Sequence, residues 1–133
     1  MGNRAVVTFD NYDPNNFGVY LHWNGGRDSI EAMLEATKRI METRGEDPTY
    51  AMARFVQVAT TAIPGNCSIG LNQLKRLDTD NFDNGVYVVD SKTLEIVGRH
   101  HHDGPEQNHH NVEEFADILV KAVEASAEVI HNA

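Results

Sequence analysis

Gly25, Gly26 and Arg27 lie between an apolar stretch and a helical pattern in the segment YLHWNGGRDSIEAMLEA. Glycines can take positive φ and leave backbone N–H groups unobstructed. A helix N-terminus attracts anions, and the arginine fork matches a phosphate group. The spacing therefore predicts either a site for a phosphate-like anion or a plain strand-to-helix turn. Asp28 and Glu31 favour the turn, because they are anions that can occupy the same N–H groups.

Five further residues could complete such a site: Tyr20, His22, Phe82, Asn84 and Arg99. Phe82 is the apolar residue in the acidic segment DTDNFDNG, so it either packs into the core or stays exposed to contact a base or a protein partner. Tyr20 offers a second ring for stacking, and His22 shares its face of a strand by alternation. Asn84 and Arg99 would add polar contacts to the ligand.

Histidines cluster in RHHHDGPEQNHH. His100 and His102 would share one face if the strand continued, which is a usable spacing for metal ligands. His109 and His110 follow in the same polar segment. A solvated loop is the favoured interpretation, because no fixed pattern such as His-Glu-x-x-His accompanies the cluster. We therefore assign no metal ligand, no catalytic residue and no cofactor.

The composition limits the class of protein. The chain has 133 residues, 41% of them hydrophobic and 23% charged, which fits one domain of an ordinary globular protein. A net charge of −9 argues against direct nucleic-acid binding and permits a basic protein partner. The absence of a long apolar run or signal-like N-terminus predicts a cytoplasmic protein without membrane contact. Cys67, the lone cysteine, is interpreted as inert packing in a strand.

The elements follow the order ββααβββα. The first two strands are Arg4 to Phe9 and Phe17 to Trp23, with Trp23 predicted in the core. The first helix begins at Asp28 or Ser29 through a capping box with Glu31 and ends at Gly45; the second begins after Asp47. Three more strands come from CSIGLNQL, GVYVVD and LEIVGRHH. We expect one α+β domain over residues 1–133, with a mostly antiparallel sheet of about five strands.

A long C-terminal helix is predicted at about residues 112–131, after an exposed His-rich loop at about 100–111. This helix has two apolar stripes. The first, with Leu119 and Val123, packs on the core. The second contains Ile118, Ala122, Ala125 and Val129, and either sinks into the same core or contacts another subunit. The second alternative predicts a homo-oligomer formed through this helix.

Four segments together resemble a family of small, mostly uncharacterised proteins carried by phages and prophages: GNRAVV, YLHWNGGRDS, DNGVYVVD and EIVGR. They cover residues 2–29 and 84–99 in the same order. The histidine loop and terminal helix look like an addition to that pattern. The resemblance implies no catalytic residues for this chain. The resemblance implies a small viral accessory protein that acts in the cytoplasm of a prokaryotic host.

The sequence is compatible with three functions. The leading expectation is counter-defence by sequestering a nucleotide-like anionic ligand, held by Arg27 and the Gly25 and Gly26 backbone. The second is an acidic protein-binding inhibitor of a host defence complex, of the anti-CRISPR type, because an acidic surface can occupy a basic channel. The third is a metal-dependent enzyme that uses the histidine cluster.

Overall fold

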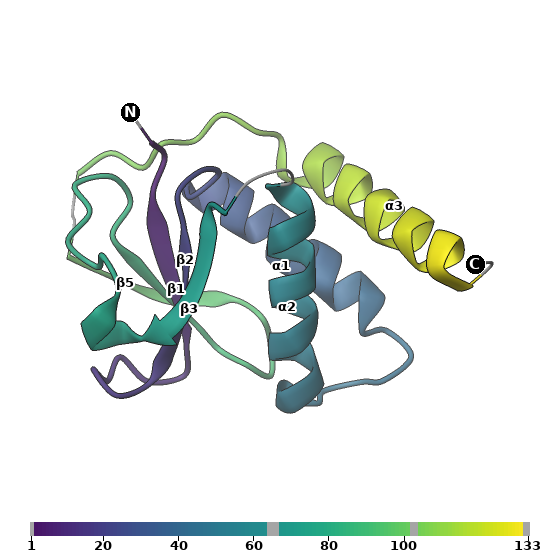
Figure 1. The fold of residues 1–133 in the computed structure, drawn as a ribbon, viewed down its shortest axis with the longest axis horizontal. Helices are drawn as coiled ribbons and strands as arrows, with labels where there is room; N and C mark the ends of the chain where they lie inside the picture. Colours follow the sequence, from purple (N-terminus) through teal and green to yellow (C-terminus); the bar gives the residue numbers. More distant parts are fainter. Residues whose placement is uncertain (1, 64–66, 102–103, 132–133) are drawn as a thin grey trace.

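A computed structural model describes residues 2–63, 67–101 and 104–131. Within them a five-stranded sheet has the order β3-β2-β1-β4-β5, and the three α-helices lie on one side of it (Figure 1). A short 3₁₀ helix, Leu74–Arg76, follows β3 and packs Leu74 on the other side. The strands are β1 (Ala5–Phe9), β2 (Phe17–Leu21), β3 (Ile69–Gln73), β4 (Val86–Val89) and β5 (Ile96–His100). β1 and β4 pair in parallel, and the other three pairs are antiparallel. The predicted α+β class, element order and mostly antiparallel sheet are confirmed.

The central strands are covered on both faces. All five residues of β1 and all four of β4 are buried. Val7 and Tyr87 face the helices, whereas Val6 and Val86 pack with Leu74 on the opposite face. The face opposite the α-helices is covered because the chain leaves the edge strand β3 and crosses β2 and β1 on that side to reach β4. Continuous apolar runs such as AVV are typical of strands buried on both sides.

Two helices pack on the sheet through apolar faces. Helix α1 (Arg27–Ile40) buries Ile30, Met33 and Leu34, and α2 (Pro48–Ala62) buries Phe55 and Val58. Asp47 is the N-cap of α2 and Pro48 its first residue, as predicted. The start of α1 differs from the prediction, because its N-cap is Gly26 and its own side chains form no capping box. A distant segment caps it instead, as described below.

Helix α3 (Val112–His131) confirms the predicted C-terminal helix, and its first half packs on α1 and α2. Ala116, Leu119 and Val123 enter the core. Arg39 of α1 ties the two helices together through Glu113 and Asp117. None of the described helices is long and apolar enough to span a membrane.

Two local expectations are wrong. Trp23 is 41% exposed rather than in the core, because β2 ends at Leu21 and the chain turns at Asn24, where φ is 56°. The inside–outside alternation of the strand therefore does not extend to Trp23. Cys67 is exposed, because β3 begins two residues later at Ile69.

The burial of Leu119 gives a test of how α3 is attached. Leu119→Ala should lower the free energy of unfolding by about 2–4 kcal/mol, because it leaves a cavity between α3 and the core. Val97→Ala is the matched control, since Val97 is 64% exposed and its truncation should change the value by less than about 0.5 kcal/mol. Urea denaturation measures both. Equal effects would contradict the packing described.

Candidate functional site

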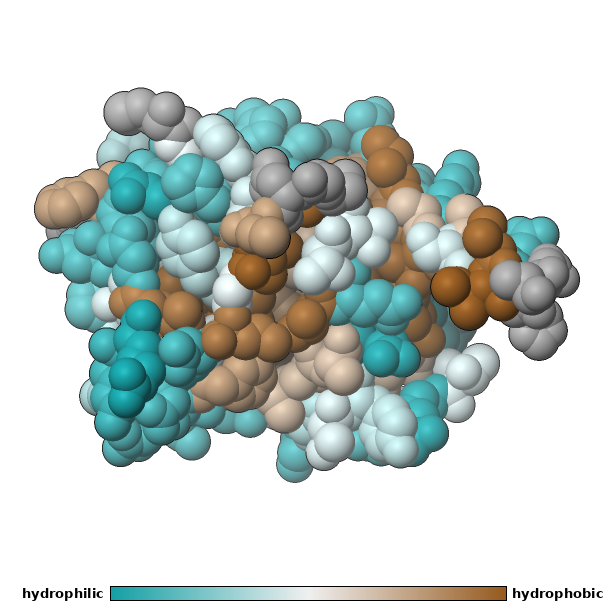
Figure 2. Space-filling model, in the orientation of Figure 1, coloured by the Kyte–Doolittle hydropathy of each residue, from teal (hydrophilic) through white to brown (hydrophobic). Residues whose placement is uncertain are grey.

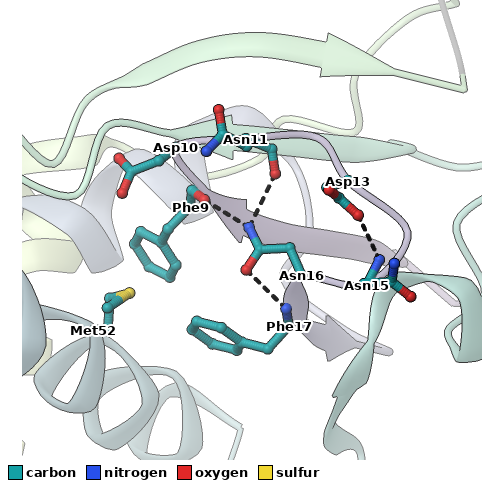
Figure 3. A pocket seen from close by; sticks show the side chains of 8 residues that line it. All are labelled: Phe9, Asp10, Asn11, Asp13, Asn15, Asn16, Phe17 and Met52. Atoms are coloured by element: carbon teal, nitrogen blue, oxygen red, sulfur yellow. Dashed lines mark hydrogen bonds between the residues drawn. The ribbon is translucent and has the colours of Figure 1, made fainter.

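A hollow of about 510 Å³ lies between the β1–β2 connection and α2, with Phe9, Phe17 and Met52 around its apolar side (Figure 3). Its polar rim is engaged by the chain itself. The amide of Asn16 donates to the backbone oxygens of Phe9 and Asn11, and the carboxylate of Asp10 accepts from Ser91. These groups shape the loop and do not converge on a ligand.

The predicted anion site at the start of α1 is filled by the protein's own chain. The N–H of Gly25 donates to the carbonyl of Asn3 over 2.9 Å. Gly26 is pressed against the backbone of Gln107, so that any Cβ there would overlap its carbonyl oxygen. Neither glycine takes the positive φ that the residue type allows, and Gly26 has φ −65°. Close backbone approach is therefore the reason for glycine at this turn.

Arg27 is held by a carboxylate from the same intruding segment. Its Nε donates to Glu106 Oε2 over 2.7 Å, and its guanidinium lies 5.3 Å from the centre of the Tyr87 ring. The Tyr87 hydroxyl donates to the same Glu106 oxygen, also over 2.7 Å. Burial, followed by this hydrogen bond, raises the pKa of Tyr87, so it stays a protonated donor. Glu106 thus takes the place that the hypothesis gave to a phosphate.

Residues 104–111, which we call the strap, cap α1 and are fixed by it in return. Asn108 Oδ1 accepts the N–H of Asp28 over 2.9 Å, which satisfies a donor at the helix start. The Asp28 carboxylate then accepts the backbone N–H groups of His109 and His110. Asp28 is only 9% exposed, so these bonds form in a largely dry setting. The strap is therefore an ordered part of the fold, although it is a loop whose residues Pro105, Asn108, His109 and Asn111 are exposed, as a polar loop predicts.

Asn84 and Arg99 bind the other end of the strap. The amide of Asn84 is fully buried and exchanges hydrogen bonds with Gln107, accepting its backbone N–H and donating to its Oε1. Arg99 Nε donates to the Asn84 carbonyl and Nη1 to the Gly104 carbonyl. Arg99 Nη2 is buried without a hydrogen-bond partner in the described part of the chain. The structure thus gathers five predicted site residues, Gly25, Gly26, Arg27, Asn84 and Arg99, around the strap.

Tyr20 and His22 lie on the opposite face of the sheet and bind one another. The Tyr20 hydroxyl is 2.9 Å from His22 Nδ1, and Tyr20 packs against the buried cluster of Val6, Leu74 and Val86. Burial raises the pKa of Tyr20, and the nearby carboxylate of Asp78 adds to the effect. These two residues therefore do not join the others in one pocket.

Phe82 is exposed at the tip of a rigid loop. It is 76% exposed and has φ 61°, a left-handed conformation that is unfavourable for an aromatic residue. The residues on either side are buried. Asn81 accepts the N–H groups of Asp83 and Gly85, and Asp83 accepts from the backbone N and the Nε of Arg4. The core-anchor interpretation of Phe82 is wrong, because the ring is exposed; contact of the ring with a base or a partner stays a prediction.

The histidines that the structure describes in this cluster pack against other rings. His100 stacks on Tyr12, and His110 stacks on Phe115 at 4.1 Å between ring centres. Among the described residues, no three His, Cys, Asp or Glu side chains group as metal ligands would. His102, one of the two residues of the suggested strand pair, lies outside the described residues.

Sequence reasoning missed the strap as the partner of the Gly-Gly turn. Glu106, Gln107 and Asn108 were interpreted only as polar loop residues. The one signal in the sequence was their type, since an acid and two amides are the side chains that cap and bridge exposed backbone groups. Nothing in their spacing pointed to a turn about 80 residues away.

Comparison of this chain with protein-family models, with curated proteins and with solved structures gave no match.

Removing the charge of Asp28 should loosen the strap. Asp28→Asn leaves two backbone donors of the strap with a weaker acceptor, so the free energy of unfolding should fall by about 2 kcal/mol. Amide hydrogen exchange at His109 and His110 should accelerate. The control is Glu31→Gln, which removes an exposed charge from the same helix. Unchanged exchange in Asp28→Asn would contradict the strap's role.

His110 makes stability depend on pH. Burial, with the neighbouring His109, lowers the pKa of His110, while Asp28 opposes the shift. The unfolded chain then binds a proton near the ordinary histidine pKa of about 6.5, where the folded chain resists it. The free energy of unfolding should therefore fall as the pH drops below that value, and level off below the folded pKa.

His110→Gln removes the titrating group and should flatten this part of the profile. His100→Gln, at an exposed position, is the control and should keep the slope of the parent protein. Urea denaturation at a series of pH values gives both profiles. Parallel profiles for the parent protein and His110→Gln would rule out this linkage.

Proposed function

We propose that this protein acts by binding another protein, and that the Phe82 ring is the group that enters the partner. The observation that carries the proposal is the combination of exposure and strain at one aromatic residue. A left-handed conformation disfavours a non-glycine residue by roughly 1–2 kcal/mol. Buried Asn81 and Asp83 nevertheless hold the backbone so that the ring stays in solvent. Strain retained at such a position is typical of binding sites.

The chemistry of the loop indicates the partner's surface. Asp78 and Asp80 are exposed on the same loop, and the chain has a net charge of −9. An aromatic anchor with two exposed acids on its loop, of which Asp78 lies 3.5 Å from Arg4, fits an apolar pocket with a rim of Lys and Arg side chains. Basic rims of this kind line nucleic-acid channels, which an acidic protein can occupy.

The resemblance to phage and prophage proteins supports a biological setting for this contact. In that setting the chain is a viral accessory protein that inhibits a host defence complex, in the manner of anti-CRISPR proteins. The competing idea of a sequestered nucleotide loses its main support, because Glu106 already occupies Arg27 and Gln107 covers Gly26.

Phe82→Asn separates binding from folding. Asparagine tolerates the left-handed conformation, so the free energy of unfolding should stay equal or rise by up to about 1 kcal/mol. Capture of the partner should be lost. Affinity capture from prokaryotic cells that contain defence systems, followed by mass spectrometry, identifies the partner, and titration calorimetry with the purified partner measures the loss.

Tyr50→Ala is the control, because it removes another exposed aromatic ring from a different surface. It should leave the partner bound. Binding of the parent protein should also weaken with salt, as the acidic loop predicts. A partner retained equally by Phe82→Asn, or one insensitive to salt, would refute the proposal.

A further inference from the structure

The C-terminal part of α3 extends beyond the rest of the protein (Figure 1), and its apolar residues Val129 and Ile130 are exposed. Leu119 and Val123 are buried, whereas Ile130, one heptad after Val123 on the same line, is 77% exposed. An open hollow of about 350 Å³ is lined by Ala125, Ser126, Val129 and Ile130. Apolar residues gather on the surface toward this end of the helix (Figure 2). The apolar pattern thus continues past the point where α1 and α2 support it.

A second stripe runs along the side of the helix next to the buried one. It contains Ile118, Ala122, Ala125 and Val129, separated by four, three and four residues. Ile118 is 62% and Val129 69% exposed. Alternating steps of three and four place side chains in one seam that faces another helix. The two alanines at its centre allow close approach of a second backbone.

We propose that α3 pairs in antiparallel orientation with α3 of a second copy of this chain. The side chains along the seam are large, small, small and large in turn, so the pattern is the same in either direction. Two-fold pairing sets Ala122 of each copy against Ala125 of the other, and Ile118 against Val129. An interface made of one patch that matches itself is what a two-fold dimer requires.

The charges on α3 favour the second copy and fix its direction. Lys121 is the one Lys or Arg in the helix, and it borders the seam on the same flank as Glu128. In the antiparallel pair, Lys121 of each copy lies beside Glu128 of the other. A parallel pair would put the Lys121 and Glu128 flanks of the two copies on opposite sides of the interface, so that these charges could not pair. The sequence of the helix is therefore complementary to itself in one orientation.

The seam is short. A single pair of helices contacts less than the roughly 800 Å² per partner of a standard stable interface. We therefore expect a dimer that forms and dissociates with concentration. Sedimentation velocity of the full chain, from low to high micromolar concentration, should show the average mass rising from one copy toward two.

Ala125→Glu places a charge in the middle of the seam and should raise the concentration at half-dimerisation by about tenfold or more. Ala127→Glu is the matched control, since it introduces the same side chain at an exposed position about 200° around the helix. It should dimerise like the parent protein. Both positions are exposed, and circular dichroism checks that both variants remain folded.

A charge exchange tests the orientation. Lys121→Glu and Glu128→Lys should each weaken the dimer, because each creates a like-charged pair across the seam. Combining the two should restore it. A chain that is monomeric throughout, equal loss in Ala127→Glu and Ala125→Glu, or no recovery in the double variant would each overturn the proposal. Phe82→Asn should dimerise normally, so failure here is distinct from failure of the partner contact.

Discussion

The acceptance of two strap N–H groups by the Asp28 carboxylate is the interaction on which the arrangement of this protein depends. It joins the start of α1 to the segment that leads into α3. Glu106 and Asn108 of the same strap hold Arg27 and cap the helix. The strap thus replaces a ligand at a place where backbone donors and an arginine would otherwise attract an anion. A set of residues that resembles a binding site is in this way used to hold the fold together.

The Phe82 loop shows the opposite arrangement, in which a side chain is left available for a partner. There the polar groups of Asn81 and Asp83 are satisfied internally, and the one residue between them is left outside with an unfavourable backbone. A loop of this kind changes little when it binds, so ordering it adds little to the cost of association. The two regions are linked, because Asn84 follows the Phe82 tip and bonds to Gln107 of the strap.

The sequence predicted the elements well where the pattern is local. Alternation and apolar runs located the strands, and Pro48 after Asp47 located the start of α2. It failed where a distant segment decides the outcome. The start of α1 was misplaced because its cap, Asn108, comes from 80 residues away. Phe82 could not be assigned from its neighbours, since its exposure depends on Arg4 fixing Asp83. Gly26 was correctly singled out, but for its conformation and not for its contact with Gln107.

The contact between Gly26 and Gln107 has a consequence for how related chains can vary. A side chain at position 26 and a strap at positions 104–111 cannot coexist. Related chains that lack the strap are free to replace the glycine, and in them Arg27 loses its built-in carboxylate. Chains that keep the strap must keep the glycine. Position 26 and the strap should therefore be inherited as a unit, and a sequence that keeps the glycine and Arg27 but lacks the strap would have an open cationic surface at the start of α1.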